Sequence, residues 1–404
     1  MESLSRFTLL FLAMAACGDP SGARAPLLEP LVRDSADVRI VENPRPPSGS
    51  RLDWRVGTEP AVSIGELEGA DPYLLQWALD ALILPDGRIV VANTSTDELR
   101  VFDALGRHLE TWGGSGEGPG EFTSLSQVYR WREDSLIALY SQGRRLSVFD
   151  SAGNFGRAFS LQRDDKFFLV EAVSPAGVIL TSDLFMRGSL PEGLSRPEEH
   201  FRVRGSEGQM VTSLGSFPGT EWFSYWSGTS GWGSEIAFAH RISAFAWGDL
   251  VVVAPSDTYE IKAFGPNGTL QRIVRREHDL VVSTPAHIDA EIELQAAQAD
   301  EGEEETVRQE LRERYELVPL PENFPAFRTA MADLTGHLWV REFELPGEDR
   351  SIPVWTIFDP DGRVLGFVET PAGLDIYEIG DDYILGIARD DMRVEYIQVW
   401  SLER

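Results

Sequence analysis

Short runs of apolar residues alternate with turn residues along most of this chain of 404 residues. Between residues 78 and 122 the sequence ALDALILPDGRIVVANTSTDELRVFDALGRHLETWGGSGEGPGEF contains four such runs. Every break between the runs carries Gly, Asp or Pro, the residues that tight turns between antiparallel strands require. The pattern therefore predicts four short antiparallel strands in this segment.

The same unit recurs in weaker form at intervals of roughly 40 to 50 residues, a spacing typical of repeat proteins. LRVFDALGRHLETW of the first unit aligns with LSVFDSAGNFGRAF, which places Phe102 and Asp103 on Phe149 and Asp150. Six units of four strands predict an all-β fold, a six-bladed β-propeller. Five or seven blades remain alternatives, because the third unit is diffuse. The later units are predicted at residues 125–165, 167–215, 242–275, 327–369 and 377–401.

Residues 53–64 (DWRVGTEPAVSI) have strand character but belong to no unit of their own. An early strand of this kind can complete the last sheet and close the ring. Closure removes the exposed sheet edges that would otherwise pair with other chains. We therefore expect the propeller to cover residues 51–404.

Residues 284–317 interrupt the β pattern. Thr284 and Pro285 form a helix start, with a capping hydroxyl followed by Pro at the first helical position. Apolar residues then recur every four positions in two segments separated by Gly302. The pattern predicts a helical insertion between blades four and five, at one mouth of the ring. It acts either as a cap on a blade edge or as a lid or partner surface.

The first 17 residues predict a signal peptide, because an arginine precedes the short apolar stretch FTLLFLAMAAC. That stretch is too short to span a bilayer. Cys17 is the only cysteine, so it cannot form a structural disulfide within the chain. The ending Ala-Ala-Cys resembles the bacterial lipoprotein box, and the resemblance implies that Cys17 is acylated. Ordinary secretion, with Cys17 incidental, is the alternative.

Residues 18–50 are rich in Gly, Pro, Ser and charged residues, a composition that predicts a flexible tether. Residues 38–41 are the one part of it with strand character. The formal net charge of the chain is −29. An excess of this size repels phosphate backbones, so we expect no nucleic-acid partner. The negative net charge is typical of an acidic surface that keeps a protein soluble, or of a protein that binds cations or basic partners.

The segment GGSGEGPGEF at residues 113–122, together with VFDALGRHLETW before it, resembles the NHL-type repeat. The whole chain is similar to bacterial six-bladed β-propeller lipoproteins of that superfamily. This resemblance implies either a binding scaffold or, as in a minority of relatives, a lyase or lactonase with a metal at the central channel. The glycines do not form a nucleotide loop, because the Lys-Ser/Thr of a phosphate cradle is missing.

The candidate metal ligands are scattered. None of the six histidines forms a metal-binding motif. Asp183, Asp257 and Glu342 follow the second strands of blades three, four and five, where they could share a divalent cation, calcium or zinc, at one mouth. Capping of strand ends is the alternative. His240, beside Arg241, is the best histidine for the channel, although a hydrogen-bonded structural role explains it as well.

Aromatic residues are concentrated in WFSYWSGTSGW, residues 222–232. We expect a loop in which Trp222, Tyr225, Trp226 and Trp232 stack on a sugar or a peptide. Packing within a blade is the alternative. Aromatic residues at matched blade positions, such as Phe102 and Phe149, are expected to pack between neighbouring sheets.

Together these features predict an exported protein of the bacterial cell envelope, a periplasmic or outer-surface lipoprotein held at the membrane by its N-terminal lipid. The expected function is non-catalytic binding of an envelope protein, peptide or glycan through the propeller face, without a cofactor. The ligand residues would be the aromatic set with His240 and Arg241. The alternative is a metal-dependent hydrolase or lyase that uses calcium or zinc in the central channel.

Overall fold

The computed structural model describes residues 29–140, 144–161, 168–183, 190–227, 230–300, 302–348 and 351–404. The predicted signal peptide, Cys17 and the first part of the predicted tether lie outside these residues. No helix among the described residues is long and apolar enough to cross a membrane.

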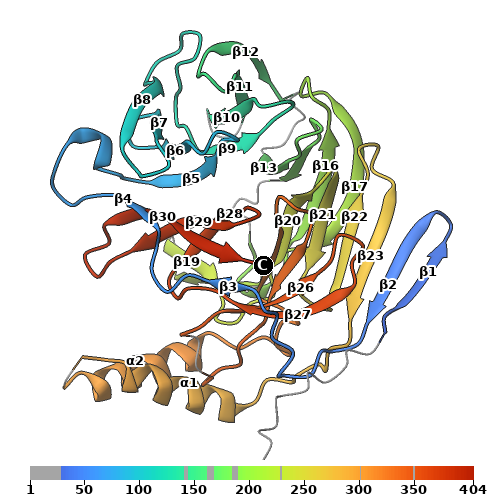
Figure 1. Ribbon diagram of the computed structural model, residues 1–404. Helices are drawn as coiled ribbons and strands as arrows, with labels where there is room; N and C mark the ends of the chain where they lie inside the picture. Colours follow the sequence, from blue (N-terminus) through green and yellow to red (C-terminus); the bar gives the residue numbers. More distant parts are fainter. Residues whose placement is uncertain are drawn as a thin grey trace, which may run out of the picture.

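Six antiparallel sheets follow one another along the chain and surround a common axis (Figure 1). We call them blades one to six. Blade one contains β5 (Ala78–Ile83), β6 (Ile89–Asn93), β7 (Glu98–Phe102) and β8 (His108–Gly113). Blade two contains β9 (Gln127–Arg130), β10 (Leu136–Tyr140), β11 (Arg145–Phe149) and β12 (Phe155–Ser160). Blade three contains β13 (Phe168–Val173), β14 (Ile179–Asp183), β16 (Glu198–Arg204) and β17 (Met210–Pro218).

The second half of the ring repeats this arrangement. Blade four contains β20 (Ile242–Trp247), β21 (Leu250–Pro255), β22 (Glu260–Phe264) and β23 (Leu270–Arg276). Blade five contains β24 (Thr329–Ala332), β25 (Leu338–Arg341), β26 (Val354–Phe358) and β27 (Val364–Glu369). Blade six contains β28 (Asp375–Ile379), β29 (Tyr383–Arg389) and β30 (Glu395–Glu403). The first strand of blade one contacts those of blades two and six, and the first strand of blade four contacts those of blades three and five. First strands of all six blades line the central cavity, so they form the inner wall of the ring.

The ring is closed by strands from the beginning of the chain. β3 (Arg55–Val56) and β4 (Val62–Ile64) both pair antiparallel with β30, and Ile64 lies opposite Ile397. Ile64 is 1% exposed and packs with residues of blades one and six. The predicted closure by residues 53–64 is therefore confirmed.

The turn between β7 and β8 shows why the repeated Phe-Asp-x-x-Gly pattern forms a hairpin. The Oδ1 atom of Asp103 accepts hydrogen bonds from the backbone N–H groups of Leu105 and Arg107, at 2.9 Å each. Gly106 has φ +78°, which a residue with a side chain rarely adopts. A Cβ atom there would also lie 2.9 Å from Val62 of the closing strand β4. The glycine therefore serves both the turn and the contact between blades one and six.

Aromatic residues pack between the blades, as the repeat predicted. Phe102 is buried between blades one and six, while Trp112, Phe122 and Phe149 share one cluster between blades one and two. The rings of Phe122 and Phe149 are 5.8 Å apart. These contacts bury large apolar surfaces and hold each blade against the next.

The prediction of a flexible tether over residues 18–50 is wrong for its second half. β1 (Leu31–Ser35) and β2 (Val38–Asn43) form a hairpin, and β2 pairs in parallel with β23 at the outer edge of blade four. Asn43 is buried, and its side chain donates to the carbonyl groups of Arg275 and Gly362 at 2.9 Å each. The strand character expected for residues 38–41 is confirmed by β2, but its pairing was not predicted because the edge that pairs with it is formed more than 200 residues later.

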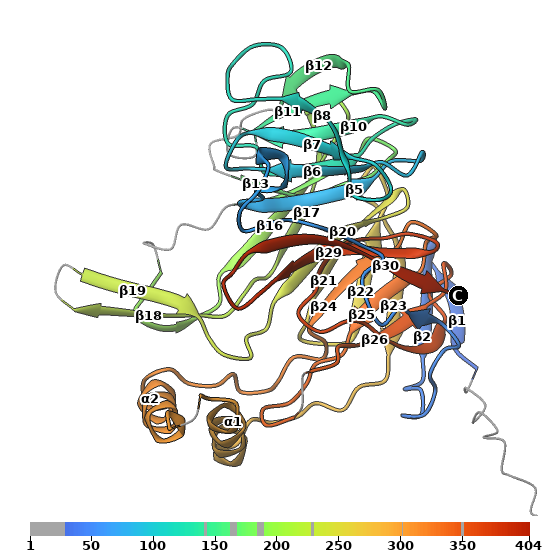
Figure 2. The ribbon, with the colours of Figure 1, turned by 60° about the vertical axis from the view of Figure 1, so that its left-hand side comes forward.

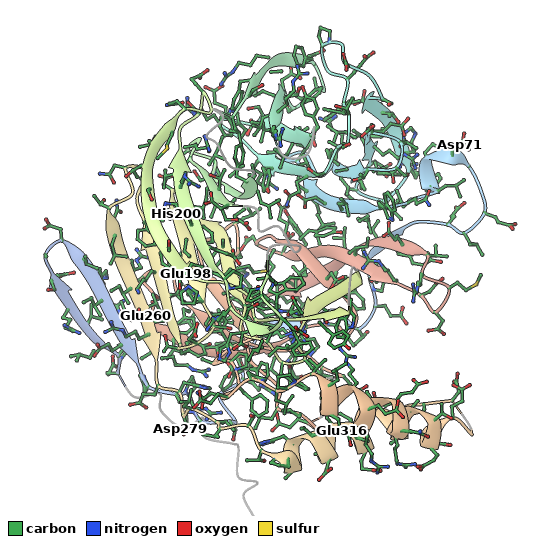
Figure 3. The ribbon with its side chains drawn as sticks, turned by 180° about the vertical axis from the view of Figure 1, so that it is seen from behind. Asp71, Glu198, His200, Glu260, Asp279 and Glu316 are labelled. Carbon is green, nitrogen blue, oxygen red and sulfur yellow. The ribbon has the colours of Figure 1, made fainter. Side chains whose placement is uncertain are left out.

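A helical insertion and a small sheet lie outside the six blades (Figure 2). α1 (Pro285–Ala297) and α2 (Glu304–Leu317) confirm the helical insertion predicted over residues 284–317 between blades four and five. A small sheet of β15 (Gly193–Ser195), β18 (Trp222–Ser227) and β19 (Ser230–Glu235) projects on the same side as the helices. A single 3-10 turn, η1 (Asp71–Tyr73), precedes blade one. Seen from behind, His200 on β16 lies far from the helical insertion that carries Glu316 (Figure 3).

Ring closure can be tested by shortening one buried side chain of the closing strand. Ile64→Ala should lower the free energy of unfolding by about 2–5 kcal/mol, because it leaves a cavity between blades one and six. Leu67→Ala is the control: Leu67 is 56% exposed and should cost less than about 0.5 kcal/mol. Urea unfolding followed by tryptophan fluorescence measures both values. Equal midpoints for the two variants would contradict the closing role of β4.

Candidate binding site in the central channel

The centre of the ring holds a cavity of about 600 Å³. The first strands of all six blades line it, together with the turns that follow the first strands of blades three, four and five. Its wall is mainly apolar, but charged side chains interrupt it at several strands. One lining residue from each blade, in chain order, is Asp80, Arg130, Glu171, Phe245, Met331 and Glu378.

Two of these charged residues neutralise each other. The Nε atom of Arg130 donates to Oε2 of Glu378 at 2.7 Å, and its Nη2 atom donates to Oε1 at 3.0 Å. The Tyr383 hydroxyl donates to the same Oε1 atom at 2.5 Å. This network joins blade two to blade six across the inner wall, and it leaves the Glu378 charge compensated.

Asp80 and Glu171 have no cationic partner among the described residues. Asp80 accepts hydrogen bonds from the backbone N–H groups of Ala81 and Val128, at 2.9 and 3.1 Å. Burial raises the pKa of Asp80 to about 7, and the charge of Glu378 adds to this rise. Glu171 accepts a hydrogen bond from the Ser182 hydroxyl at 2.5 Å, and burial raises its pKa as well. Both carboxyl groups can therefore bind a further donor.

Tyr129 lies on β9, between the strands that carry these two carboxyl groups. Its hydroxyl is buried and finds no hydrogen-bond partner among the described residues. Burial, with the charges of Asp80 and Glu171, raises the pKa of Tyr129 well above its ordinary value. Because a buried polar group without a partner is costly, this hydroxyl is suited to a ligand or a water molecule.

The sequence analysis missed these channel residues, although each leaves a signal. Asp80 in ALDALI, Glu171 in FLVEAV and Glu378 in DIYEI are acidic residues in the interior of mainly apolar first strands. A charged residue at such a position is expensive unless it faces a polar cavity or a partner. Comparing the first strand of each repeat would therefore have identified them.

The structure does not bring the three predicted metal ligands together. Asp183 pairs with Arg202, Asp257 pairs with Arg196, and Glu342 pairs with Arg276. The Arg276 contacts to Glu342 are 2.6 and 3.0 Å long. Within the described ranges, no group of three or more His, Cys, Asp or Glu side chains is arranged to hold a metal ion. Asp183 ends its second strand, whereas Asp257 and Glu342 follow theirs, and each of the three carboxylates pairs with its own arginine.

Asp257 illustrates the electrostatic balance at these pairs. Burial alone would raise its pKa, but the hydrogen bond and charge of Arg196 hold the pKa below its ordinary value. Tyr259, whose ring lies 3.9 Å from the Arg276 guanidinium, adds a cation–π contact to the Glu342 pair. These arrangements are typical of structural ion pairs.

His240 and Arg241 have different roles in the structure. His240 is buried, and its Nδ1 atom lies 2.9 Å from Oε2 of Glu221. Burial opposes the ionisation of Glu221, but the hydrogen bonds from His240 lower its pKa overall. Arg241 pairs with Glu235 and lines a separate pocket beside the helical insertion. His240 does not line the central cavity.

The aromatic segment 222–232 forms a hairpin of β18 and β19, where a loop was expected. The alternation of small and aromatic residues permits strand pairing, and Tyr225 lies opposite Trp232. Tyr225 is 39% exposed and Trp232 is 44% exposed. Trp222 is half-buried, and its β18 neighbour Phe223 packs against the cluster that contains Val318 at the end of α2. The side chain of Trp226 lies outside the described part of the structure.

Comparison with protein families agrees with the number of blades. Residues 66–169, which contain blades one and two, match the model of a family, DUF5128, described as a 6-bladed beta-propeller. The six sheets around one axis complete that description. The chain is a six-bladed β-propeller. A comparison with curated proteins gave no match.

Several solved structures resemble the propeller at low sequence identity. A putative exported protein from Bacteroides fragilis is 13% identical, with 90% of this chain and 99% of that chain covered and a TM-score of 0.48. A member of the DUF4221 family from Bacteroides vulgatus is 10% identical, with 87% and 99% covered and a TM-score of 0.44. Virginiamycin B lyase from Staphylococcus aureus is 9% identical, with 87% of this chain and 100% of that chain covered and a TM-score of 0.37. These values are too low to assign the function of any of those proteins to this propeller.

The structural role of Glu342 predicts a large loss of stability when it is removed. Glu342→Ala should lower the free energy of unfolding by about 3–5 kcal/mol, because Arg276 is then left buried without its partner. Glu369→Ala, which breaks the exposed pair with Arg51, should cost less than about 1 kcal/mol. Thermal unfolding with and without calcium or zinc measures these effects. Unchanged stability of Glu342→Ala together with loss of a bound metal would support the metal-ligand interpretation instead.

Proposed function

We propose that the protein is a non-catalytic binding protein of the bacterial cell envelope, whose channel binds the amino group of a peptide or glycan. The observation that supports this proposal is the pair of carboxyl groups, Asp80 and Glu171, which line the cavity without a cationic partner among the described residues. An ammonium group carries three N–H donors and a positive charge, so it complements two carboxyl groups that line one cavity from the first strands of blades one and three.

The remainder of the cavity suits the body of such a ligand. Tyr129 offers a free hydroxyl, while Phe245 and Tyr377 supply aromatic surface on which a cation can rest. Leu79, Ala81 and Met331 are among the apolar lining residues. A volume of about 600 Å³ lies in the usual range for small-molecule sites, so an amino-acid side chain or an amino sugar fits.

The N-terminal sequence supports a location at the cell envelope. We propose that residues 1–17 are removed or processed as a signal peptide and that acylated Cys17 anchors the protein to a membrane. The net charge of −29 attracts basic ligands to the surface and increases their rate of encounter. The exposed Tyr225 and Trp232 of the projecting hairpin offer a second surface for an envelope protein, peptide or glycan.

We do not extend the proposal to catalysis. Because arginines satisfy Asp183, Asp257 and Glu342, and Glu221 holds His240, the residues that would have supported a metal-dependent hydrolase or lyase have other partners. We propose that binding requires neither calcium nor zinc. Chelator treatment of the purified protein should accordingly leave the affinity for its ligand unchanged.

The binding proposal is tested with a blocked lysine tripeptide and its Nε-acetylated form as probes in isothermal titration calorimetry. Wild-type protein should bind only the peptide with the free amine. Asp80→Asn should weaken binding by about tenfold, the cost of one charged hydrogen bond. Glu310→Gln on the exposed face of α2 is the matched control and should bind as wild type. Equal affinity for both peptides would overturn the proposal.

The raised pKa of Asp80 also predicts a pH dependence of stability. The folded protein holds this proton more tightly than the unfolded chain, so the contribution of Asp80 to stability falls as pH rises from about 4 to about 7. Asp80→Asn has no such titration, and its stability relative to wild type should therefore improve between pH 5 and pH 8. Urea unfolding at both pH values measures the difference. A constant difference would show that Asp80 is already ionised at pH 5.

A further inference from the structure

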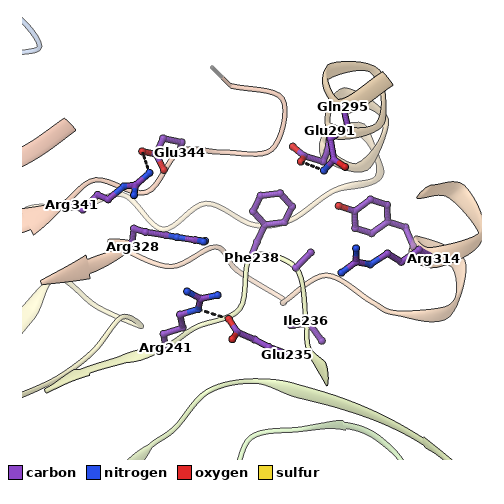
Figure 4. A pocket seen from close by; sticks show the side chains of 12 residues that line it. Glu235, Ile236, Phe238, Arg241, Glu291, Gln295, Arg314, Arg328, Arg341 and Glu344 are labelled. Atoms are coloured by element: carbon purple, nitrogen blue, oxygen red, sulfur yellow. Dashed lines mark hydrogen bonds and ion pairs between the residues drawn. The ribbon is translucent and has the colours of Figure 1, made fainter. Parts of the chain in front are cut away.

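A second pocket lies between the propeller and the helical insertion (Figure 4). It is on the side of the ring opposite to the turns that follow the first strands and line the channel. Its volume is about 370 Å³. Arg241 and Arg328 precede the first strands of blades four and five, and Arg341 ends the second strand of blade five. Arg314 comes from α2. Four arginines from separate segments therefore meet around one space in a protein with a net charge of −29.

Two of these arginines already have acidic partners. Arg241 pairs with Glu235, and Arg341 pairs with Glu344 at 3.4 Å. The side chains of Arg328 and Arg314 make no hydrogen bond or ion pair within the part of the chain that the structure describes. Figure 4 shows them extending into the pocket from opposite sides. Arg328 is half-buried, whereas Arg314 is exposed.

The position of Arg328 is electrostatically costly without an anion. Burial disfavours its charge, and the neighbouring charges of Arg241 and Arg341 lower its pKa further. The Nε atom of Arg341 is buried without a partner among the described residues. Half-buried charges and unused donors of this kind are stabilised by an oxyanion, because a guanidinium donates two parallel hydrogen bonds to it.

The walls of the pocket are held in place by packing. Glu291 of α1 is buried and accepts a hydrogen bond from the backbone N–H of Gly347 at 3.0 Å. Phe238 adopts φ +61°, a strained conformation for a bulky residue, and its ring lies 5.9 Å from Phe324 and 6.2 Å from Phe343. Strain of this kind is retained where a site must keep its shape. The Glu291–Gly347 hydrogen bond therefore ties α1 of the insertion to the segment that follows the second strand of blade five.

We propose that this pocket binds a carboxylate carried on a short apolar or aromatic group, with Arg328 as the principal contact and Arg314 as a second. Phe238 and Ile236 line the pocket beside the arginines and suit the apolar part. A phosphate dianion fits less well, because Glu235, Glu291 and Glu344 lie in the same wall and offset most of the positive charge. The site is separate from the channel, so it does not depend on the function proposed there.

The test uses phenylacetate as the probe, with phenylacetamide and inorganic phosphate as comparisons, in isothermal titration calorimetry. Wild-type protein should bind phenylacetate, bind phosphate more weakly and not bind the amide. Arg328→Met should weaken phenylacetate binding at least about tenfold, the loss of a charged hydrogen bond. Arg328→Lys should recover only part of the affinity, because lysine keeps the charge but lacks the planar fork.

Two further measurements separate binding from folding. Arg328→Met should leave the Tm of the ligand-free protein unchanged or higher, because repulsion from Arg241 and Arg341 is relieved. Arg314→Ala on the exposed face of α2 should weaken binding roughly threefold, while Arg312→Ala, two residues away and outside the pocket, should not. A lower Tm with unchanged binding in Arg328→Met, or tighter binding of phosphate than of phenylacetate, would overturn the proposal.

Discussion

The pairing of β3 and β4 with β30 is the constraint on which the rest of the structure depends. Each blade is a small sheet with one face against the next blade, so none can bury its apolar faces alone. Joining the earliest propeller strands to the last sheet turns an open row of blades into a closed ring and covers the outer edge of β30. The packing of Gly106 against Val62 shows that even a surface turn of blade one is fitted to this closure.

Because the ring is closed, the first strands of all blades face a common axis. Acidic residues that are separated by tens to hundreds of positions along the chain, such as Asp80, Glu171 and Glu378, therefore line one cavity. Their charges are compensated unequally: Arg130 pairs with Glu378, while Asp80 and Glu171 accept only neutral donors. The channel thus keeps a negative character that suits a cationic group.

The pocket beside the helical insertion has a positive character instead, because arginines of blades four and five meet an arginine of α2 there. Two arginines pair with carboxylates that follow second strands and so hold neighbouring blades together: Arg276 with Glu342, and Arg196 with Asp257. At blade five the insertion supplies Arg314 to the pocket that Arg328 also lines, and no described carboxylate pairs with either side chain. The linings of the channel and of the pocket beside the insertion therefore differ in charge, and the two ligand proposals rest on this difference.

The sequence by itself determined the repeated hairpins, the closing strand and the helical insertion, since turn residues and apolar spacing are local properties. It did not reveal that β2 pairs with β23, which lies more than 200 positions later in the chain. It also did not reveal the arginine partners of Asp183, Asp257 and Glu342, which lie 19, 61 and 66 positions away. It also did not indicate which charges remain without a partner in the channel and beside the insertion. Only the tertiary structure decided this, because compensation of a charge depends on distances between side chains that closure of the ring brings together.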